Sequence, residues 1–411
     1  MHVQFIVPYT PNLIRTRPYN LIRCILKLGH LVSVCTLWSD ESEKENLAEL
    51  SRLGVQVVAQ QQSRQRSLWN CLLALPTPSP LQAVYSWNPS LAKQTATLLE
   101  CNAEPAVDVI HVEHLRGARY GLFLKARFPG TPVVWDSVDC ISYLFKQASD
   151  QSRSGFGKLI TRFDLTRTRR YEGQLPGQFD HVLITSGVDR QALLELIPKQ
   201  TVAAPVSVLP NGVDWDYFSQ DQGVNREPAT LILSGKMSYH ANVTMAMYLM
   251  NQIMPRVWAK RSEARLLIVG KDPPASVRGL ADHPAVTVTG TVPDFRPYLQ
   301  RASIAVVPLL YGAGIQNKVL EAMASGTPVV STPPAVLTLD AEPDRDLLIA
   351  QTPEEFSEKI IYLIENPQLR SQIGSAGRRY VENNHQWVKI AERLEGVYDE
   401  VLCARREHRL H

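Results

Sequence analysis

Short apolar runs rich in Val and Ile alternate with longer amphipathic stretches along most of the chain. The first series of runs predicts strands at residues 3–7, 31–37, 55–59, 108–112, 132–136 and 181–186. A second series predicts strands at residues 229–235, 264–270, 285–290, 304–309, 327–332 and 346–350. Continuous apolar strands separated by helices are typical of parallel sheets that are buried on both faces. The pattern therefore predicts an α/β protein.

The two series of strands predict two domains. The first series ends near the Asn-Gly turn of SVLPNGVDWDYF (207–218), and the polar stretch at 219–229 is typical of a linker. A chain of 411 residues is also too long for one ordinary core. We therefore expect two doubly wound, Rossmann-like domains, over residues 1–215 and 216–385, that face a central ligand cleft. The amphipathic segment 386–402 predicts a long helix that packs in either domain or crosses back to the first.

A glycine loop stands at the junction of a predicted strand and a predicted helix in YGAGIQNKVLEAMASGTPVVST (311–332). Glycine lets backbone N–H groups approach an anion closely, and a helix N-terminus adds a partial positive charge. Lys318, in the first helical turn, adds a full positive charge. These features predict a diphosphate site that needs no metal ion. The loop residues that we expect at this site are Gly312, Gly314, Ile315 and Gln316.

Glu321 follows about one helical turn beyond the loop. A carboxylate there would repel a phosphate, but it suits a pair of neighbouring hydroxyl groups such as those of a ribose. A tight turn followed by a solvated glutamate would give the same Gly-x-Gly spacing. The apolar neighbours of Glu321 and the Pro-Val-Val strand that follows favour a binding site for a nucleoside diphosphate.

Several segments in combination resemble the group-one family of retaining GT-B glycosyltransferases, which acts on bacterial polysaccharides and glycolipids. They are LPNGVDWDYF (209–218), LSGKMSYHANV (233–243), LLIVGKDPP (266–274), VTVTGTVPDFRPYL (286–299), KVLEAMASGTPVVST (318–332) and QIGSAGRRYVENNHQW (372–387). The match extends over about residues 180–400 and is looser in the first half. The resemblance implies a GT-B fold, a nucleotide-sugar donor and a saccharide or lipid-linked acceptor. It also implies transfer with retention in polysaccharide or glycoconjugate biosynthesis.

The resemblance assigns roles to several residues of the second domain. Glu321 matches the glutamate expected on the donor ribose, Gly235 lies in the first glycine loop, and Val292 lies in a segment expected to line the base pocket. Lys236 matches an arginine that neutralises the leaving diphosphate.

Two positions depart from the family pattern. The first of its two glutamates, which contacts the transferred sugar, falls on Ala313, and its diphosphate lysine falls on Ala241. A branch of the family has a small residue beside a lysine at the first of these positions, and this sequence resembles that branch. We expect Lys318 to supply the missing positive charge.

The first half contains candidates for the acceptor side. Arg17, in the loop after the first predicted strand, is expected to bring positive charge to the donor, although an arginine that caps a surface loop would look the same. Asp136 and Asp139 follow a predicted strand, where an acid could accept a proton from the acceptor hydroxyl or orient a sugar. A helix cap is the alternative for Asp136. His114, after the preceding strand, is an alternative catalytic residue.

Residues 153–170, RSGFGKLITRFDLTRTRR, combine six basic side chains and one acid with an apolar stripe. Such a helix can lie on an anionic membrane. An ordinary solvated helix face over a core stripe has the same pattern.

Composition excludes several classes of protein. Forty-three basic and forty acidic residues leave a net charge of +3, which argues against bulk nucleic-acid binding. The six cysteines lack metal-ligand or redox spacing, and the acid pairs at 214–216 and 344–346 do not follow a strand beside a phosphate loop. We therefore expect no metal and no cofactor besides the nucleotide sugar. The start resembles no signal peptide, so we expect a cytoplasmic protein, and the segment 153–170 leaves peripheral contact at the inner membrane face open as an alternative.

The sequence thus favours a metal-independent glycosyltransferase. Two alternatives stay open. Ala241 and Ala313 would also fit a non-catalytic protein that binds nucleotide sugars. A sugar-phosphate enzyme of the same fold, such as a phosphorylase, ranks last because the chain shows no context for a lysine-linked cofactor.

Overall fold

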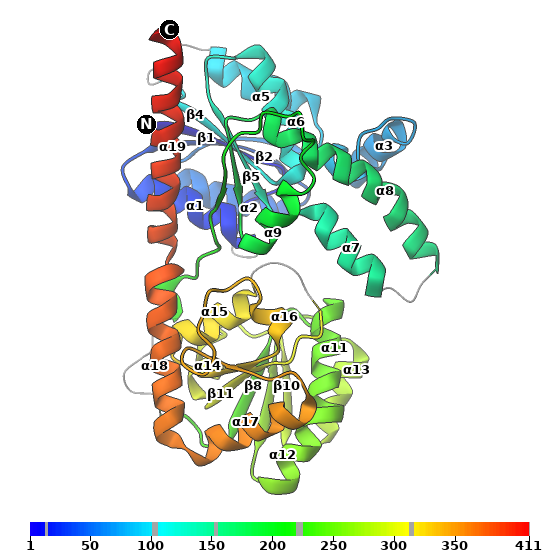
Figure 1. The fold of residues 1–411 in the computed structure, drawn as a ribbon, viewed down its shortest axis with the longest axis vertical. Coiled ribbons are helices and arrows are strands. Elements are labelled where there is room, and N and C mark those ends of the chain that lie inside the picture. Colours follow the sequence, from blue (N-terminus) through cyan, green and yellow to red (C-terminus); the bar gives the residue numbers. More distant parts are fainter. Residues whose placement is uncertain (13–14, 101–105, 152–154, 219–224, 312–315, 411) are drawn as a thin grey trace. The chain divides into compact units, whose positions relative to one another are not determined.

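The structure of the chain is a computed structural model that divides into two compact units. It describes residues 1–12, 15–100, 106–151, 155–218, 225–311 and 316–410, with only the backbone described at 148–151, 155–162 and 408–410. The first unit comprises Met1–Pro210 and Val388–His411, and the second comprises Asn211–Trp387 (Figure 1). The sequence had predicted a boundary near residue 215. The chain leaves the first unit five residues earlier, between Pro210 and Asn211, just before the glycine of the predicted turn.

The first unit is built on a parallel sheet of seven strands in the order β3-β2-β1-β4-β5-β6-β7. Its strands are β1 (His2–Val7), β2 (Leu31–Trp38), β3 (Gln56–Gln61), β4 (Val109–Glu113), β5 (Val133–Val138), β6 (His181–Ile184) and β7 (Val206–Val208). Six of them were predicted from apolar runs. The run Val206–Val208 was missed because only four residues separate Pro205 from Pro210.

Most helices of the first unit connect these parallel strands, and α19 (Trp387–Leu410) is the last helix along the chain. The others are α1 (Thr16–Lys27), α2 (Glu41–Arg52), α3 (Arg64–Ala74), α4 (Leu81–Tyr85), α5 (Pro89–Glu100), α6 (His114–Arg127), α7 (Ile141–Gln151), α8 (Gly155–Gln174) and α9 (Gly187–Leu194), with a 3-10 turn at Leu175–Gly177. Side-chain caps fix several helix starts. Asp40 accepts the Glu43 N–H at 3.0 Å before α2, and Ser186 accepts the Asp189 N–H at 3.1 Å before α9.

The C-terminal helix α19 packs against the first unit. The Tyr398 hydroxyl and His111 Nδ1 lie 2.8 Å apart in the buried interior. At the surface, Glu395 pairs with His30 at 2.7 Å and Arg405 pairs with Asp180 at 2.6 Å. The last helix of the chain therefore completes the unit that the first strand begins.

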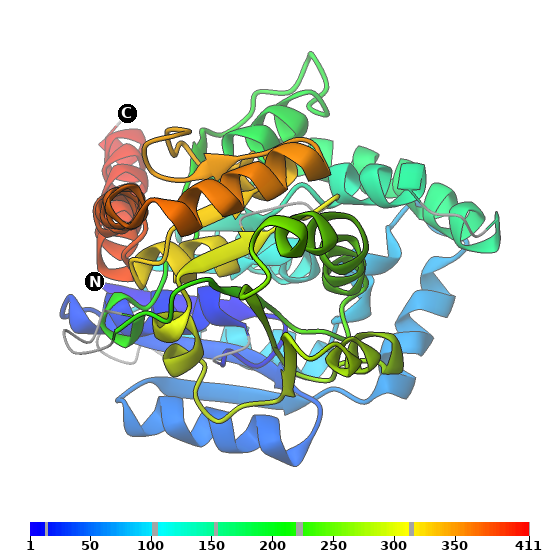
Figure 2. The ribbon, with the colours of Figure 1, turned by 90° about the horizontal axis from the view of Figure 1, so that it is seen from below.

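The second unit is built on a parallel sheet of six strands in the order β10-β9-β8-β11-β12-β13. They are β8 (Thr230–Ser234), β9 (Arg265–Val269), β10 (Val286–Gly290), β11 (Ile304–Val307), β12 (Val329–Ser331) and β13 (Leu348–Ile349). All six were predicted, with longer bounds. Helices lie on both sides of this sheet (Figure 2).

The second unit also contains helices that connect or flank its strands. They are α10 (Trp215–Phe218), α11 (His240–Tyr248), α12 (Met254–Lys260), α13 (Ala275–Arg278), α14 (Arg296–Arg301), α15 (Asn317–Ala324), α16 (Pro333–Val336), α17 (Pro353–Glu365) and α18 (Pro367–Asn384), with a π turn at Leu249–Ile253 and a 3-10 turn at Gly279–Asp282. Thr352 accepts the Glu355 N–H at 3.2 Å, and Pro353 opens α17 where no N–H donor is needed.

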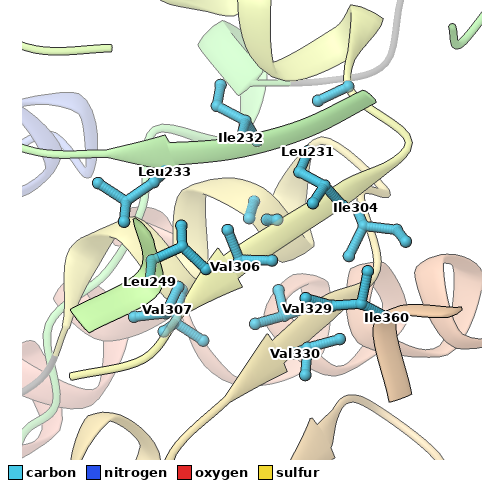
Figure 3. Packing of buried hydrophobic residues seen from close by; sticks show 14 of the residues in the cluster. Leu231, Ile232, Leu233, Leu249, Ile304, Val306, Val307, Val329, Val330 and Ile360 are labelled. Atoms are coloured by element: carbon cyan, nitrogen blue, oxygen red, sulfur yellow. The ribbon is translucent and has the colours of Figure 1, made fainter. Parts of the chain in front are cut away.

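The core of the second unit is a continuous cluster of aliphatic side chains. Leu231 and Leu233 of β8 pack with Val306 of β11 and Val329 of β12, and Ile360 of α17 closes the cluster (Figure 3). These side chains are buried, and burial of apolar surface stabilises the sheet by roughly 25 cal/mol per Å². This core is the scaffold that supports the carboxyl edge of the sheet.

A close backbone contact ties the ends of β8 and β9 together. A Cβ atom on Gly270 would lie 1.8 Å from the carbonyl oxygen of Gly235. Neither partner is a side chain that could swing away. Only glycine therefore fits at position 270.

We predict that Gly270→Ala destabilises the second unit by about 1–3 kcal/mol or more, because the backbone must move to admit the methyl group. Its thermal unfolding midpoint should fall by about 2–4 °C per kcal/mol. Gly279→Ala is the matched control, since a Cβ atom there meets nothing within 4 Å and the backbone is helical. Equal midpoints for the two variants would show that the backbone contact is not a constraint.

Candidate functional site

The carboxyl edge of the second sheet has the geometry of a ligand site. Strands β8 and β11 are neighbours, but the chain leaves them in opposite directions along the sheet, towards β9 and β12. The helices that follow them therefore diverge, and ligands of doubly wound folds bind at such a switch point. The predicted residues Gly235 and Lys236 follow β8, and Lys318 lies in the first turn of α15, which follows β11.

Gly235 is required at this edge for two reasons. Its φ of +144° is a conformation that side chains other than glycine rarely adopt. A Cβ atom would also lie 2.8 Å from Nδ2 of Asn242 and 3.4 Å from Cε of Lys318. The missing side chain therefore gives Asn242 and Lys318 the space to meet.

Asn242 joins the loop after β8 to the first turn of α15. Lys318 Nζ donates to Asn242 Oδ1 at 2.7 Å, and Asn242 Nδ2 donates to the Lys236 carbonyl at 2.9 Å. The Lys318 ammonium is thus held above Gly235 by a neutral amide. Within the described part of the chain, the exposed Lys236 side chain makes no hydrogen bond or ion pair, so its charge is free to meet a ligand.

Burial shifts both ionisable groups on α15 towards their neutral forms. Burial lowers the pKa of Lys318 to about 8, although the Glu321 carboxylate opposes the shift. Burial likewise raises the pKa of Glu321 to about 7, and the Lys318 charge opposes that shift. A bound anion would favour the charged lysine, and a hydroxyl that donates to Glu321 would favour its carboxylate. Both shifts are therefore of the kind that a ligand can reverse.

The other predicted donor residues lie at or near this edge. Gln316 caps α15, and its Oε1 lies 3.5 Å from Lys318 Nζ. Val292 follows β10 and packs, partly buried, against the core of the second unit. Gly312, Gly314 and Ile315 lie outside the described residues, as does Ala313. Ala241 is buried in the core, and its methyl group offers no charge to a ligand.

A second contact, which the sequence analysis missed, joins α11 to Tyr311 in the segment that follows β11. The Tyr311 hydroxyl hydrogen-bonds to the His240 ring and lies 3.0 Å from Thr244 Oγ1. Tyr311 immediately precedes the glycine loop. The only sequence signal for this contact is that His240 and Thr244 are one helical turn apart and therefore lie on the same face of α11.

In the first unit, Arg17 and Asp136 form a buried ion pair. Nε and Nη2 of Arg17 each lie 2.8 Å from Asp136 Oδ2, and Nη1 donates to the Pro210 carbonyl at 3.2 Å. Burial alone would raise the pKa of Asp136, but the Arg17 and His111 side chains hold it well below its usual range. Asp136 is therefore a fixed carboxylate and a weak proton acceptor. The predicted contact of Arg17 with the donor stays a prediction.

Glu113, beside Asp136 in the register of β4 and β5, carries the opposite pKa shift. Burial and the Asp136 charge raise its pKa to about 8, so its carboxyl is mostly protonated at neutral pH. The Tyr9 hydroxyl donates to Glu113 Oε1 at 2.7 Å. The sequence analysis did not identify Tyr9 or Glu113 as site residues, because each lies at the end of an apolar run that predicts a strand.

Asp139 lies just beyond β5 and keeps part of its surface accessible. Burial, followed by the neighbouring Asp189 charge, raises its pKa to about 6. The turn that holds it is fixed by buried acids. Asp189 accepts the Cys140 N–H at 3.2 Å, and Glu172 accepts the N–H groups of Ile141 and Ser142 at 2.8 and 2.9 Å. Asp139 is thus held by a rigid turn and titrates near neutral pH.

His114, the alternative catalytic residue, opens α6 with a φ of +63°. Burial, then the Arg116 charge, lowers its pKa to about 3, so the ring is neutral. The Arg116 N–H donates to His114 Nδ1 at 3.2 Å. A positive φ at a non-glycine residue is strained and is often found at functional sites.

The basic segment 153–170 forms the helix α8 over most of its length, but its first side chains lie outside the described part. In the described part, Asp164 is buried and accepts the Leu81 N–H at 3.0 Å. Arg167 donates to the carbonyls of Ala74 and Leu75. None of the helices in the described part has the length and apolar character needed to cross a bilayer.

Comparison with known proteins agrees with this geometry. Residues 228–366 match the sequence family described as glycosyl transferases group 1, and this region includes Gly235, Lys318 and Glu321. The chain is 31% identical, over 35% of its length and 41% of the relative's, to the GDP-mannose-dependent monoacylated alpha-(1-6)-phosphatidylinositol monomannoside mannosyltransferase of Corynebacterium glutamicum. The chain spans at most about half the length of the first curated relatives that it matches.

Solved structures resemble the whole chain. Sucrose-phosphate synthase from Thermosynechococcus elongatus matches with a TM-score of 0.65 and 16% identity, over 98% of this chain and all of that one. Anabaena HepE in complex with UDP-glucose matches with a TM-score of 0.66 and 15% identity, over 97% of this chain and all of that one. Two Rossmann-like units, the matched family region and these neighbours lead to one assignment. Residues 228–366 match the group 1 glycosyl transferase family, and the chain as a whole has the two-domain GT-B fold.

Proposed function

We propose that the protein is an enzyme that transfers a hexose-type sugar from a nucleoside diphosphate to a saccharide or lipid-linked acceptor. The reaction would retain the anomeric configuration, need no metal ion and serve polysaccharide or glycoconjugate biosynthesis. The observation that carries the proposal is the desolvated Lys318 ammonium, held by Asn242 above Gly235 at the switch point of the second sheet. This ammonium donates to a neutral amide, and an incoming diphosphate would add negative charge next to it.

The names of similar proteins support the class of donor. One relative is named as GDP-mannose-dependent, and one structural neighbour was solved with UDP-glucose. Both donors share a ribose and a diphosphate, the two groups for which Glu321 and Lys318 are suited. The tests below therefore use guanosine and uridine nucleotides in parallel.

The chemistry assigned to the second unit is stabilisation of the leaving group. The bond between the sugar C1 and the diphosphate oxygen breaks, and negative charge grows on the departing diphosphate. Lys236 and Lys318 would neutralise that charge, as a metal ion does in other transferases. The acceptor oxygen forms the new bond to C1 and gives up its proton.

Of the two predicted acids, Asp139 is the better candidate for that proton. Its pKa of about 6 lies near neutral pH, whereas the Arg17 pair keeps Asp136 ionised to far lower pH. We assign proton acceptance to Asp139 and a positioning role to Asp136.

A non-catalytic protein that binds nucleotide sugars is the second candidate. The buried Ala241 favours it, because a diphosphate-binding lysine of the family pattern is absent there. Such a protein would bind the donor at the same residues without turnover.

Glu321→Gln should weaken donor binding by about 1–3 kcal/mol, because a neutral amide replaces a charge-assisted acceptor for the ribose hydroxyls. Titration calorimetry with GDP and UDP measures the change. Glu358→Gln, an exposed change on α17, is the matched control. Unchanged affinity in Glu321→Gln would refute the ribose assignment.

Affinity for the preferred nucleoside diphosphate should fall as the pH rises through about 8, where Lys318 loses its proton. The bound diphosphate favours the charged lysine, so binding in this range takes up a proton. Affinity should also fall as the pH drops through about 7, where Glu321 becomes protonated. Calorimetry in buffers of different ionisation enthalpy counts the protons.

Lys318→Gln is the control for this pH profile. It should bind the diphosphate more weakly and lose the alkaline limb, while affinity for the free nucleoside changes little. An alkaline limb that persists in Lys318→Gln would assign it to another group.

Asp139→Asn and Asp136→Asn should have different effects. Loss of the Asp136 charge removes the buried carboxylate 2.8 Å from Arg17, so we expect a destabilisation of about 3–5 kcal/mol. Asp139 pairs with no cation among the described residues, so Asp139→Asn should fold normally and lower kcat by about 100-fold or more at an unchanged donor KM. Full kcat in a folded Asp139→Asn would exclude it as the proton acceptor.

A further inference from the structure

Helix α3 of the first unit carries its large apolar side chains on its solvent-exposed face. Leu68, Trp69, Leu72, Leu73 and the adjoining Leu75 have exposed fractions between 43% and 68%. Positions 68 and 72, like 69 and 73, are one helical turn apart, so they form a continuous stripe. Large contiguous apolar patches on a protein surface mark interaction sites.

The face that α3 turns towards the unit is small and polar. Ser67 is 2% exposed and bonds to Gln62, while Ala74 is 5% exposed. Asn70 Nδ2 donates to the Trp87 carbonyl at 2.9 Å. These contacts fix the rotation of the helix, so the leucines cannot roll into the core.

Positive charge surrounds this stripe. Arg64 and Arg66 occupy the exposed first turn of α3, and the chain has no acidic residue between Glu49 and Glu100. The neighbouring helix α8 brings Arg167, which donates to the last carbonyls of α3 and lies 4.3 Å from the centre of the exposed Phe163 ring. Figure 1 shows α3 and α8 at the outer margin of the first unit. The one acid in the described part of α8 before Arg167, Asp164, is buried.

A groove beside the stripe has the same mixed character. It encloses about 910 Å³ and is lined by Arg66, Trp69, Leu73, Trp87 and Arg119, among others. The Arg119 guanidinium stacks over Trp87 at 4.4 Å. Apolar floors next to arginines suit the acyl chains and phosphates of anionic lipids.

We propose that the exposed face of α3, the stripe from Leu68 to Leu75 with Arg64 and Arg66, docks the first unit on the anionic surface of a lipid bilayer. The leucines and Trp69 enter the boundary between headgroups and acyl chains, and the arginines meet lipid phosphates. The charge around the stripe favours an anionic membrane over a second copy of the chain, whose identical arginines would repel. The proposal does not depend on the transfer reaction.

Sedimentation of the full-length protein with vesicles tests the proposal. The wild type should sediment with vesicles of phosphatidylcholine and phosphatidylglycerol at low salt, less at high salt, and little with phosphatidylcholine alone. Leu72→Gln combined with Leu73→Gln should lower the partition coefficient about tenfold or more without lowering the unfolding midpoint, because both side chains are exposed. Leu31→Gln combined with Leu337→Gln, two exposed leucines elsewhere, is the matched control.

Two further variants separate the contribution of the arginines to vesicle binding from that of Trp69. Arg64→Gln with Arg66→Gln should weaken binding at low salt and have little effect at high salt. A blue shift of tryptophan emission on addition of anionic vesicles should disappear in Trp69→Phe. The proposal is overturned if the wild type fails to sediment at low salt, or if the Leu72 and Leu73 double variant sediments like the wild type. It is also overturned if light scattering shows that the wild type is a dimer and the double variant a monomer, and the wild type does not bind vesicles.

Discussion

Both units depend on one constraint of parallel sheets. All strands end on the same edge, and where the strand order reverses, the following helices diverge and leave loops that can converge on a ligand. In the first unit this edge gathers Tyr9, Glu113 and Asp136 at the ends of β1, β4 and β5. In the second it gathers Gly235 after β8 and Lys318 after β11.

The two edges hold their charges in different ways. Asp136 has its partner already, since Arg17 lies 2.8 Å away in the buried interior. Removing either member would leave a buried charge, so the pair organises the unit. Lys318 instead donates to a neutral amide, and burial lowers its pKa to about 8. A charge that is satisfied within the fold is structural, whereas one that gains from an incoming anion is suited to binding.

The sequence was sufficient for the sheets and for part of the donor edge. Apolar runs predicted twelve strands, and local spacing placed Lys318 and Glu321 on a helix behind a glycine loop. Long-range pairs could not be predicted, because Arg17 and Asp136 are 119 positions apart and either could have faced solvent. The face of α3 was also beyond sequence reasoning. Its leucines resemble core residues until the structure shows that Ser67 and Asn70 take the inner positions.

The central claim is that the donor edge supports sugar transfer, and the most direct measurement is nuclear magnetic resonance of a complete reaction. The protein would be incubated with GDP-mannose or UDP-glucose and with saccharide and lipid-linked acceptors. The account predicts that a free nucleoside diphosphate appears together with a product whose anomeric configuration equals that of the donor. A donor that binds and stays intact with every acceptor would contradict the claim and favour a non-catalytic binding protein.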